Sequence, residues 1–253
     1  MASRGPRPLV AGNWKMNGTM ASLDEVGRLM DMLVGTAVAC DIMICPPATL
    51  IAPMVRLVAS SAIKVGGQDC HSEASGAHTG DISAEMLQDT GCTGVIVGHS
   101  ERRASHGETD VLIRHKAAAA HRAGISAIIC IGETLEERKS GRTLDVVTGQ
   151  LAGALPASAS AENTVIAYEP VWAIGSGLTP GLDEVAEVHG VIRAALRERL
   201  GEAQGDAVGI LYGGSVKPDN AKNLMSASNV DGALVGGASL RAADFMGIIR
   251  AYA

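Results

Sequence analysis

The sequence predicts an α/β fold, a single closed (β/α)8 barrel in which eight parallel strands lie inside a ring of outer helices. Short apolar runs recur along the chain, and amphipathic stretches with helical spacing separate them. Runs such as Gly-Val-Ile-Val-Gly (94–98) suit parallel strands that are buried on both faces. The chain has 253 residues, the size of one such barrel. An open doubly wound sheet is the alternative, but no GxGxxG follows the first apolar run.

The strands predicted from these runs are, in order, Leu9–Trp14, Asp41–Cys45, Ile63–Gly67, Gly94–Gly98, Ala127–Ile131, Thr164–Tyr168, Val208–Tyr212 and Ala233–Val235. Helical spacing of apolar residues or a high alanine content predicts helices over Ser22–Leu33, Asp110–Arg122 and Asp183–Leu200. Ser22 is expected to cap the first of them, with Glu25 three residues later. The stretch Leu155–Ala161 is expected to be a loop. Because no linker-like stretch divides the chain, residues 1–253 are expected to form one domain.

Composition narrows the classes of function. The formal net charge of −6 argues against nucleic-acid binding, which needs a basic face. The five cysteines include no CxxC pair, so we expect free thiols in a reducing cytoplasm. No signal peptide and no apolar run of about 18 residues is visible, so no membrane partner is expected.

Sequence motifs for metals and nucleotides are also missing. There is no HExxH and no P-loop, and no cofactor is expected. His71 and His78 flank Glu73 on a stretch rich in serine and glycine, and we interpret them as residues that do not bind a metal.

The residues at the end of five predicted strands or directly after it are mostly polar residues and glycines: Asn13, Trp14, Lys15, His99, Ser100, Glu101, Glu169, Gly213, Gly214, Ser215, Gly236 and Gly237. In a barrel these positions meet at one rim. Glycine-rich turns after the last two strands commonly hold a phosphate group. A carboxylate, an imidazole and a cation beside a phosphate predict proton abstraction next to a carbonyl. Each residue alone also suits a turn, a surface or a structural hydrogen bond, so the prediction depends on their joint placement.

Five segments carry a resemblance to a known family: Ala-Gly-Asn-Trp-Lys-Met-Asn (11–17), Val-Gly-His-Ser-Glu-Arg-Arg (97–103), Ala-Tyr-Glu-Pro-Val-Trp-Ala-Ile-Gly (167–175), Tyr-Gly-Gly-Ser-Val (212–216) and Gly-Ala-Leu-Val-Gly-Gly-Ala-Ser-Leu (232–240). In these segments, and from about Pro8 to the C-terminus, the chain resembles the triosephosphate isomerases, which fold as TIM barrels. The resemblance implies interconversion of dihydroxyacetone phosphate and D-glyceraldehyde 3-phosphate, a step of glycolysis and gluconeogenesis, with no cofactor or metal.

The resemblance also implies residue roles. Glu169 would be the base and His99 would polarise the carbonyl and relay protons. Lys15 would offset negative charge, Asn13 would orient the substrate and Lys15, and Glu101 would be an auxiliary group. The substrate would bind through Asn13, Lys15, Gly175, Ser215, Gly236 and Gly237. Two alternatives keep the barrel: an isomerase of a four-carbon ketose phosphate, and a non-catalytic barrel that binds a phosphorylated metabolite.

A homodimer is the implied assembly. Residues 76–81 match the family's interdigitating loop, and Thr79 would approach the partner near its own copy of Met16. His78 stands where the family usually has a bulky aromatic residue, and Asp81 replaces a common glutamate. His78 would change packing at the subunit contact and make that contact sensitive to pH. Neither departure touches the four core catalytic positions.

Residues 170–180 match the family's mobile lid. Ile174 from this lid and Leu234 from the last strand would pack over Glu169. Leu178 follows the lid glycine where many members carry lysine or arginine, a departure that bears on hinge motion.

Overall fold

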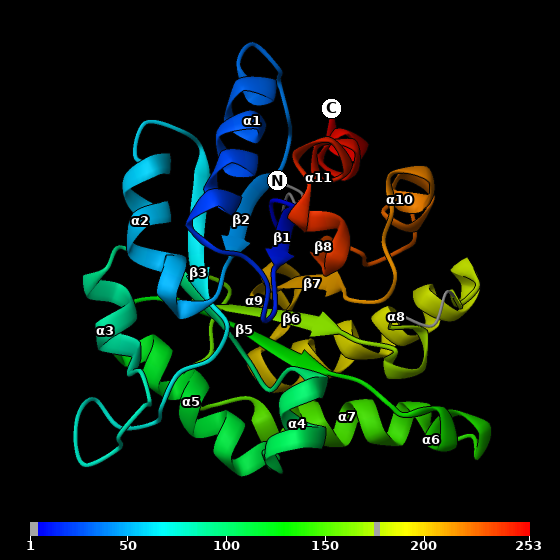
Figure 1. Cartoon of the computed structure of the whole chain (residues 1–253). Coiled ribbons are helices and arrows are strands. Elements are labelled where there is room, and N and C mark those ends of the chain that lie inside the picture. The colour runs from blue at the N-terminus through cyan, green and yellow to red at the C-terminus, as the bar shows by residue number, and fades with distance from the viewer. Residues whose placement is uncertain (1–4, 175–177) are drawn as a thin grey trace.

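The computed structural model describes residues 5–174 and 178–253, and in these ranges the chain forms a closed barrel of parallel strands (Figure 1). Each strand pairs with the next along the chain, and the last pairs with the first. The strands are β1 (Leu9–Asn13), β2 (Asp41–Cys45), β3 (Ile63–Gly67), β4 (Gly94–Val97), β5 (Ser126–Ile131), β6 (Thr164–Tyr168), β7 (Gly209–Tyr212) and β8 (Gly232–Val235). The predicted fold class is confirmed, and no strand end differs from its predicted position by more than one residue.

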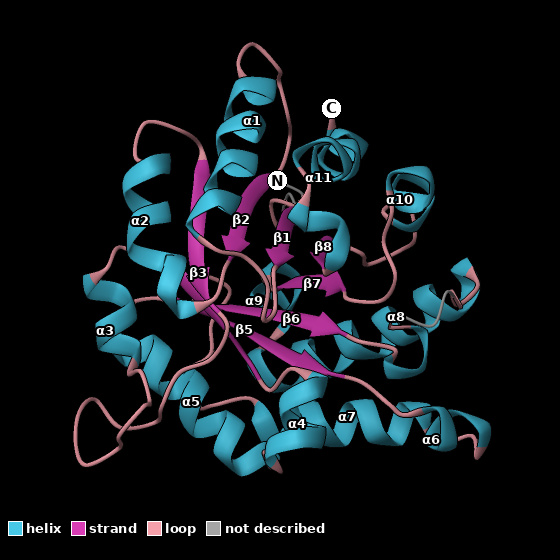
Figure 2. Ribbon diagram, in the orientation of Figure 1, coloured by secondary structure: helices cyan, strands magenta, loops and turns pink. Residues whose placement is uncertain are grey.

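Helices cover the outside of the barrel (Figure 2). They are α1 (Leu23–Leu33), α2 (Ala48–Val58), α3 (Ala84–Asp89), α4 (Ser100–His106), α5 (Asp110–Arg122), α6 (Leu135–Lys139), α7 (Thr143–Ala154), α8 (Leu182–Leu200), α9 (Glu202–Ala207), α10 (Pro218–Leu224) and α11 (Ala242–Ile249). Short 3-10 helices are η1 (Met20–Ser22), η2 (Val171–Ala173), η3 (Gly237–Leu240) and η4 (Arg250–Tyr252). No helix in the described ranges is long and apolar enough to cross a membrane.

The predicted cap at Ser22 is wrong. Ser22 closes η1 and already has a helical backbone, with φ −70° and ψ −14°, whereas a capping residue is extended. Its hydroxyl accepts a hydrogen bond from the backbone N–H of Thr19 at 3.0 Å. Glu25 turns elsewhere and accepts from the N–H of Ala242 at 2.8 Å, at the start of α11. The predicted loop at 155–161 holds no helix or strand.

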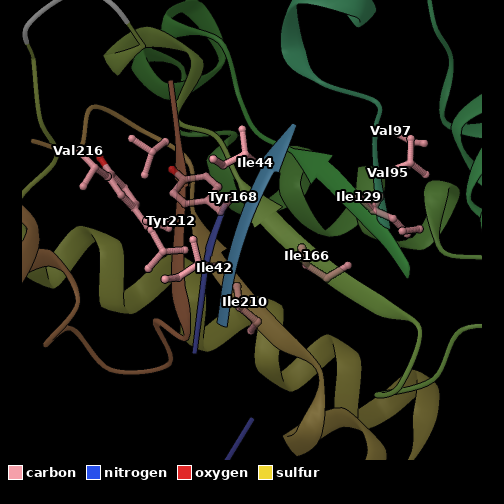
Figure 3. Packing of buried hydrophobic residues seen from close by; sticks show 14 of the residues in the cluster. Ile42, Ile44, Val95, Val97, Ile129, Ile166, Tyr168, Ile210, Tyr212 and Val216 are labelled. Atoms are coloured by element: carbon pink, nitrogen blue, oxygen red, sulfur yellow. The ribbon is translucent and has the colours of Figure 1, made fainter. Parts of the chain in front are cut away.

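The strand side chains divide the core into two layers. Alternate residues face outward and pack with helix residues in one large cluster; Figure 3 shows Ile42, Ile44 and Tyr212 among them. The intervening residues fill the barrel interior: Ala11, Met43, Cys45, Ile96, Ile128, Cys130, Ala167, Leu211 and Leu234. Burying one such aliphatic side chain stabilises the fold by about 1.5–3 kcal/mol. The barrel is therefore a packed core, and its open space lies at the rim.

Acid destabilisation is expected from His189 of α8. This imidazole is fully buried, its Nδ1 donates to the carbonyl of Asn229 at 3.0 Å, and burial lowers its pKa to about 4. An unfolded histidine titrates near 6.5, so between these values the unfolded chain binds more protons and stability falls as pH falls. Between pH 7 and 4.5, the free energy of unfolding should fall in the parent protein and in His189→Gln. The fall should be smaller in His189→Gln by roughly 2–3 kcal/mol, because the variant lacks the buried imidazole. Urea unfolding at both pH values measures this, and equal drops would contradict it.

Candidate active site

A cavity of about 340 Å³ opens at the rim formed by the carboxyl ends of the strands. Its lining includes every predicted catalytic and substrate-binding residue that the structure describes: Asn13, Lys15, His99, Glu169, Ser215, Gly236 and Gly237. Glu101, the predicted auxiliary group, is not among the residues that line it. Ile174 and Leu234 line the same cavity. Gly175, the remaining predicted residue, lies outside the described residues. Residues from five distant parts of the sequence therefore meet in one pocket, because the parallel strands that precede them end at the same rim.

Strand alternation and one glycine direct the base and the imidazole into this cavity. Ala167 faces the barrel interior, so Glu169, two residues later, points inward at the rim. The same rule would point His99 outward, because Val97 packs in the outer cluster. Gly98 breaks the alternation with φ +70°, a conformation that glycine adopts readily, and His99 turns into the pocket.

Both carboxylate oxygens of Glu169 have partners. Glu169 is 2% exposed, and its Oε1 lies 2.8 Å from Nε2 of His99. Its Oε2 accepts from the backbone N–H of Ser100 at 2.9 Å. Ser100 begins α4, and the free N–H groups at a helix start stabilise an anion. Each oxygen of the buried carboxylate therefore has a specific donor.

The hydrogen bonds of His99 define its protonation. Its Nδ1 accepts from the backbone N–H of Glu101 at 3.2 Å, so this nitrogen carries a lone pair. The ring is then neutral, and the proton on Nε2 is donated to Glu169. A neutral imidazole with its N–H pointing into the pocket is suited to donate to a substrate oxygen as negative charge develops there.

Lys15 is held in a strained backbone conformation. Its φ is +54°, a region that residues other than glycine seldom occupy and that costs about 1–3 kcal/mol. Two side chains fix it: Asn13 Oδ1 accepts from the N–H of Lys15 at 3.0 Å, and Gln68 Nε2 donates to its carbonyl at 2.8 Å. The ammonium then reaches Glu101 Oε1 at 2.6 Å. This places one positive charge beside His99 and Glu169 in the cavity.

Two neighbouring groups keep their ordinary charge states for opposite reasons. Partial burial alone would raise the pKa of Glu101, but the hydrogen bond from Lys15 and the positive potential of the surrounding basic groups outweigh burial and hold that pKa below its usual value. Burial, reinforced by the nearby charge of Glu169, raises the pKa of the Cys130 thiol well above its usual range. Cys130 therefore lies next to the base as a neutral group.

Glycines leave room for the base and shape the turns beyond it. A Cβ on Gly213 would stand 2.9 Å from Cγ of Glu169, and one on Gly214 would stand 2.2 Å from the Tyr212 hydroxyl oxygen. Gly236 precedes η3, whose first residue lines the cavity. Backbone N–H groups in such glycine turns attract anions.

Some residues of the site were not predicted from the sequence. Lys217 also lines the cavity; it lies five residues beyond the end of β7 and so outside the pattern of residues at strand ends. Gln68 follows β3 directly, so the placement of polar residues after strands could have identified it as a residue of the site. Arg103 donates to the carbonyls of Gly98 at 3.0 Å and Cys130 at 3.1 Å, which fixes the turn that carries His99. Only these tertiary contacts reveal the role of Arg103.

Comparison with known proteins decides the family. The family model described as triosephosphate isomerase matches residues 8–252. The chain belongs to the triosephosphate isomerase family. The predicted resemblance is thereby confirmed.

Individual relatives agree over nearly the whole chain. Triosephosphate isomerase of Rhizobium meliloti (strain 1021) is 59% identical over 247 residues, which cover 97% of this chain and 96% of that protein. Triosephosphate isomerase of Bradyrhizobium diazoefficiens is 57% identical over 244 residues, covering 96% of this chain and 97% of that protein. The crystal structure of triosephosphate isomerase from Bartonella henselae matches with a TM-score of 0.90 at 49% identity, over 97% of this chain and 99% of its own. The predicted activity class, an isomerase, is confirmed, and neither alternative receives support.

Proposed function

We propose that this chain interconverts dihydroxyacetone phosphate and D-glyceraldehyde 3-phosphate through an enediolate, as a step of glycolysis and gluconeogenesis. The observation that carries the residue assignment is the pair formed by Glu169 and His99. A carboxylate that is 2% exposed lies 2.8 Å from a ring nitrogen that donates, and both line a cavity that also holds the ammonium of Lys15. A base, a proton donor and a cation are the groups that an enediolate mechanism needs.

Proton transfer in this pocket requires Glu169 to turn. Its Oε2 is engaged by the N–H of Ser100, so the carboxylate exchanges that hydrogen bond for the acidic C–H of the substrate. Glu169 then takes the proton from one carbon and returns it to the neighbouring carbon. His99 donates its Nε2 proton to the carbonyl oxygen and recovers a proton from the adjacent hydroxyl. Lys15 stabilises the negative charge that develops on these oxygens, and Asn13 fixes the backbone of Lys15.

Apolar surroundings make the base effective. Leu234 from β8 and Ile174 from the connection after β6 line the cavity with Glu169, and neutral Cys130 lies beside it. A carboxylate that gives up water on substrate binding reacts more readily with a carbon acid, because fixed protein dipoles replace its hydration shell. Exclusion of water also protects the enediolate.

The phosphate is proposed to lie among the backbones of Gly175, Ser215, Gly236 and Gly237. We expect Ser215→Ala to raise KM about tenfold with little change in kcat, because the hydroxyl beside that backbone is proposed to donate a further hydrogen bond to the phosphate, and a hydrogen bond to a charged group contributes about 1.5–3 kcal/mol. Steady-state kinetics with D-glyceraldehyde 3-phosphate measures both constants. Ser228→Ala, at an exposed serine away from the cavity, is the control. A KM that stays at the parent value would remove Ser215 from the phosphate site.

The activity itself is tested with a coupled assay. Dihydroxyacetone phosphate formed from D-glyceraldehyde 3-phosphate is reduced by an auxiliary dehydrogenase, and NADH oxidation is followed. EDTA in the assay tests the proposal that the reaction needs no metal or cofactor. Absence of turnover, or turnover that EDTA abolishes, would contradict the proposal.

We further propose that residues 1–253 form one domain and act as a homodimer in the cytoplasm. The resemblance at residues 76–81 supports the dimer, and so does Met16, an apolar side chain that is 95% exposed next to Lys15. In the dimer that the resemblance implies, the partner's copy of residues 76–81 would cover this side chain. Sedimentation equilibrium should give twice the mass of one chain, and a concentration-independent single-chain mass would contradict the dimer.

A further inference from the structure

The turn that joins β7 to α10 (Figure 1) forms one wall of the proposed catalytic cavity. All five of its residues, 213–217, line that cavity. Ser215 and Val216 belong to no helix or strand, and within the described ranges their backbone N–H groups donate to no protein oxygen. These N–H groups are therefore available as donors to an anion that enters the cavity.

Asn220 of α10 holds the last three residues of this turn. Its Nδ2 donates to the carbonyl of Ser215 at 3.1 Å, and its Oδ1 accepts from the backbone N–H of Lys217 at 2.8 Å. A carbonyl can only accept and an N–H can only donate, so these two partners define the orientation of the amide. The side chain of Asn220 thereby closes a ring across residues 215–217. Asn220 itself is not among the residues that line the cavity.

The helix that carries Asn220 is packed against the body of the barrel. Ala221 and Leu224 of α10 are buried in the outer core cluster. Pro218, the first residue of α10, lies so close to α11 that a Cβ on Gly247 would stand 2.9 Å from the Cβ of Pro218. The proline ring also restricts the backbone at the point where the turn becomes a helix. Asn220 therefore ties the turn to an element whose position is fixed by the fold.

We propose that Asn220 is a positioning residue for the substrate phosphate. It holds residues 215–217 in the conformation that presents the N–H groups of Ser215 and Val216 to the phosphate, and it does so without touching the substrate. This inference rests on the proposed function, because it assigns a further residue to the phosphate site of that reaction. A search for polar residues at strand ends would not reveal Asn220, which lies eight residues beyond the end of β7.

Positioning matters because a loose turn has to be ordered when the ligand binds. The free energy of ordering its backbone is then lost from the free energy of binding. The hydrogen bonds of Asn220 order the turn when the chain folds, so the donors are in place before the phosphate arrives. The phosphate carries the same charge in the substrate and in the enediolate. Loss of this ordering should therefore raise KM and change kcat much less.

The test measures phosphate binding separately from turnover. Glycerol 3-phosphate carries the phosphate but has no carbonyl to isomerise, and a phosphorus NMR titration gives its dissociation constant. Asn220→Ala removes both hydrogen bonds and should raise this constant, and KM for D-glyceraldehyde 3-phosphate, about tenfold. Asn220→Asp keeps the acceptor for the N–H of Lys217 but loses the donor to Ser215, and it should also weaken binding severalfold.

Asn223, three residues further along α10, provides the matched controls. It is exposed and does not line the cavity. Asn223→Ala makes the same truncation on the same helix, and Asn223→Asp adds the same charge. Both variants should keep the dissociation constant and KM of the parent within about twofold.

Four outcomes would overturn this inference: no binding of glycerol 3-phosphate by the folded parent protein, parent-like dissociation constants in both Asn220 variants, equal losses in the Asn223 variants, or a loss confined to kcat. Urea unfolding establishes that each variant is folded. A parent protein without turnover whose binding of glycerol 3-phosphate still weakens in the Asn220 variants would contradict the proposed reaction and support the role of Asn220. The two failures are therefore distinct.

Discussion

Glu169→Gln is expected to lower kcat by about 10³-fold, because a positioned general base contributes about 10²–10⁴-fold and the amide cannot accept the proton. Glutamine keeps the size of the side chain, so KM should change much less than kcat. Glu169→Asp should cost on the order of 10²-fold, since shortening the side chain withdraws the carboxylate by about 1 Å. Steady-state kinetics in the coupled assay measures all three proteins.

The matched control is Glu136→Gln, at an exposed glutamate of α6, which should keep the kinetic constants of the parent. Circular dichroism and urea unfolding establish that the Glu169 variants are folded. An undiminished kcat in Glu169→Gln would remove Glu169 from the role of base, whatever the parent protein catalyses.

The largest expected loss of stability follows replacement of Lys116 on α5. Lys116 is 5% exposed, and its ammonium lies 2.7 Å from Asp69 Oδ1 and 2.5 Å from Glu108 Oε1. Arg102 contacts both carboxylates, at 2.9 Å and 2.6 Å. Lys116→Met would leave two largely buried carboxylates with one cation between them. Removing one member of a buried ion pair costs about 3–5 kcal/mol, so we expect a loss of that order in the free energy of unfolding.

Lys64→Met is the control for this loss. Lys64 also pairs with a carboxylate, Asp41, at 2.8 Å, but its side chain is 46% exposed. Exposed pairs contribute about 0–1 kcal/mol, so this variant should lose less than 1 kcal/mol. Urea unfolding of both variants gives the comparison, and similar losses would show that burial of the Lys116 network carries no additional stability.

The barrel could be predicted because its strands are short, apolar and regularly spaced. Ile42 and Ile44 pack outward while Met43 and Cys45 pack inward, so a run that is apolar on both faces is a reliable sign of a strand in this fold. The cap at Ser22 could not be predicted in the same way, because η1 extends the helical backbone through that residue.

The site could be predicted in part, for the same topological reason. Residues at the end of a strand or directly after it, such as Asn13 and Glu169, reach the cavity because parallel strands end at one rim. Their individual roles came from the family resemblance. The strained φ of Lys15 and the hydrogen bonds from Arg103 that fix the turn before His99 depend on contacts between distant segments, which local patterns do not reveal.

The central claim, proton transfer by Glu169 through an enediolate, is tested most directly by isomerisation in deuterated water followed by proton NMR. D-glyceraldehyde 3-phosphate should give dihydroxyacetone phosphate that carries deuterium on C1, because the base exchanges its proton with solvent before returning it to carbon. Glu169→Gln should form this product about 10³-fold more slowly. A product without deuterium, or undiminished formation of deuterated product by Glu169→Gln, would contradict the mechanism.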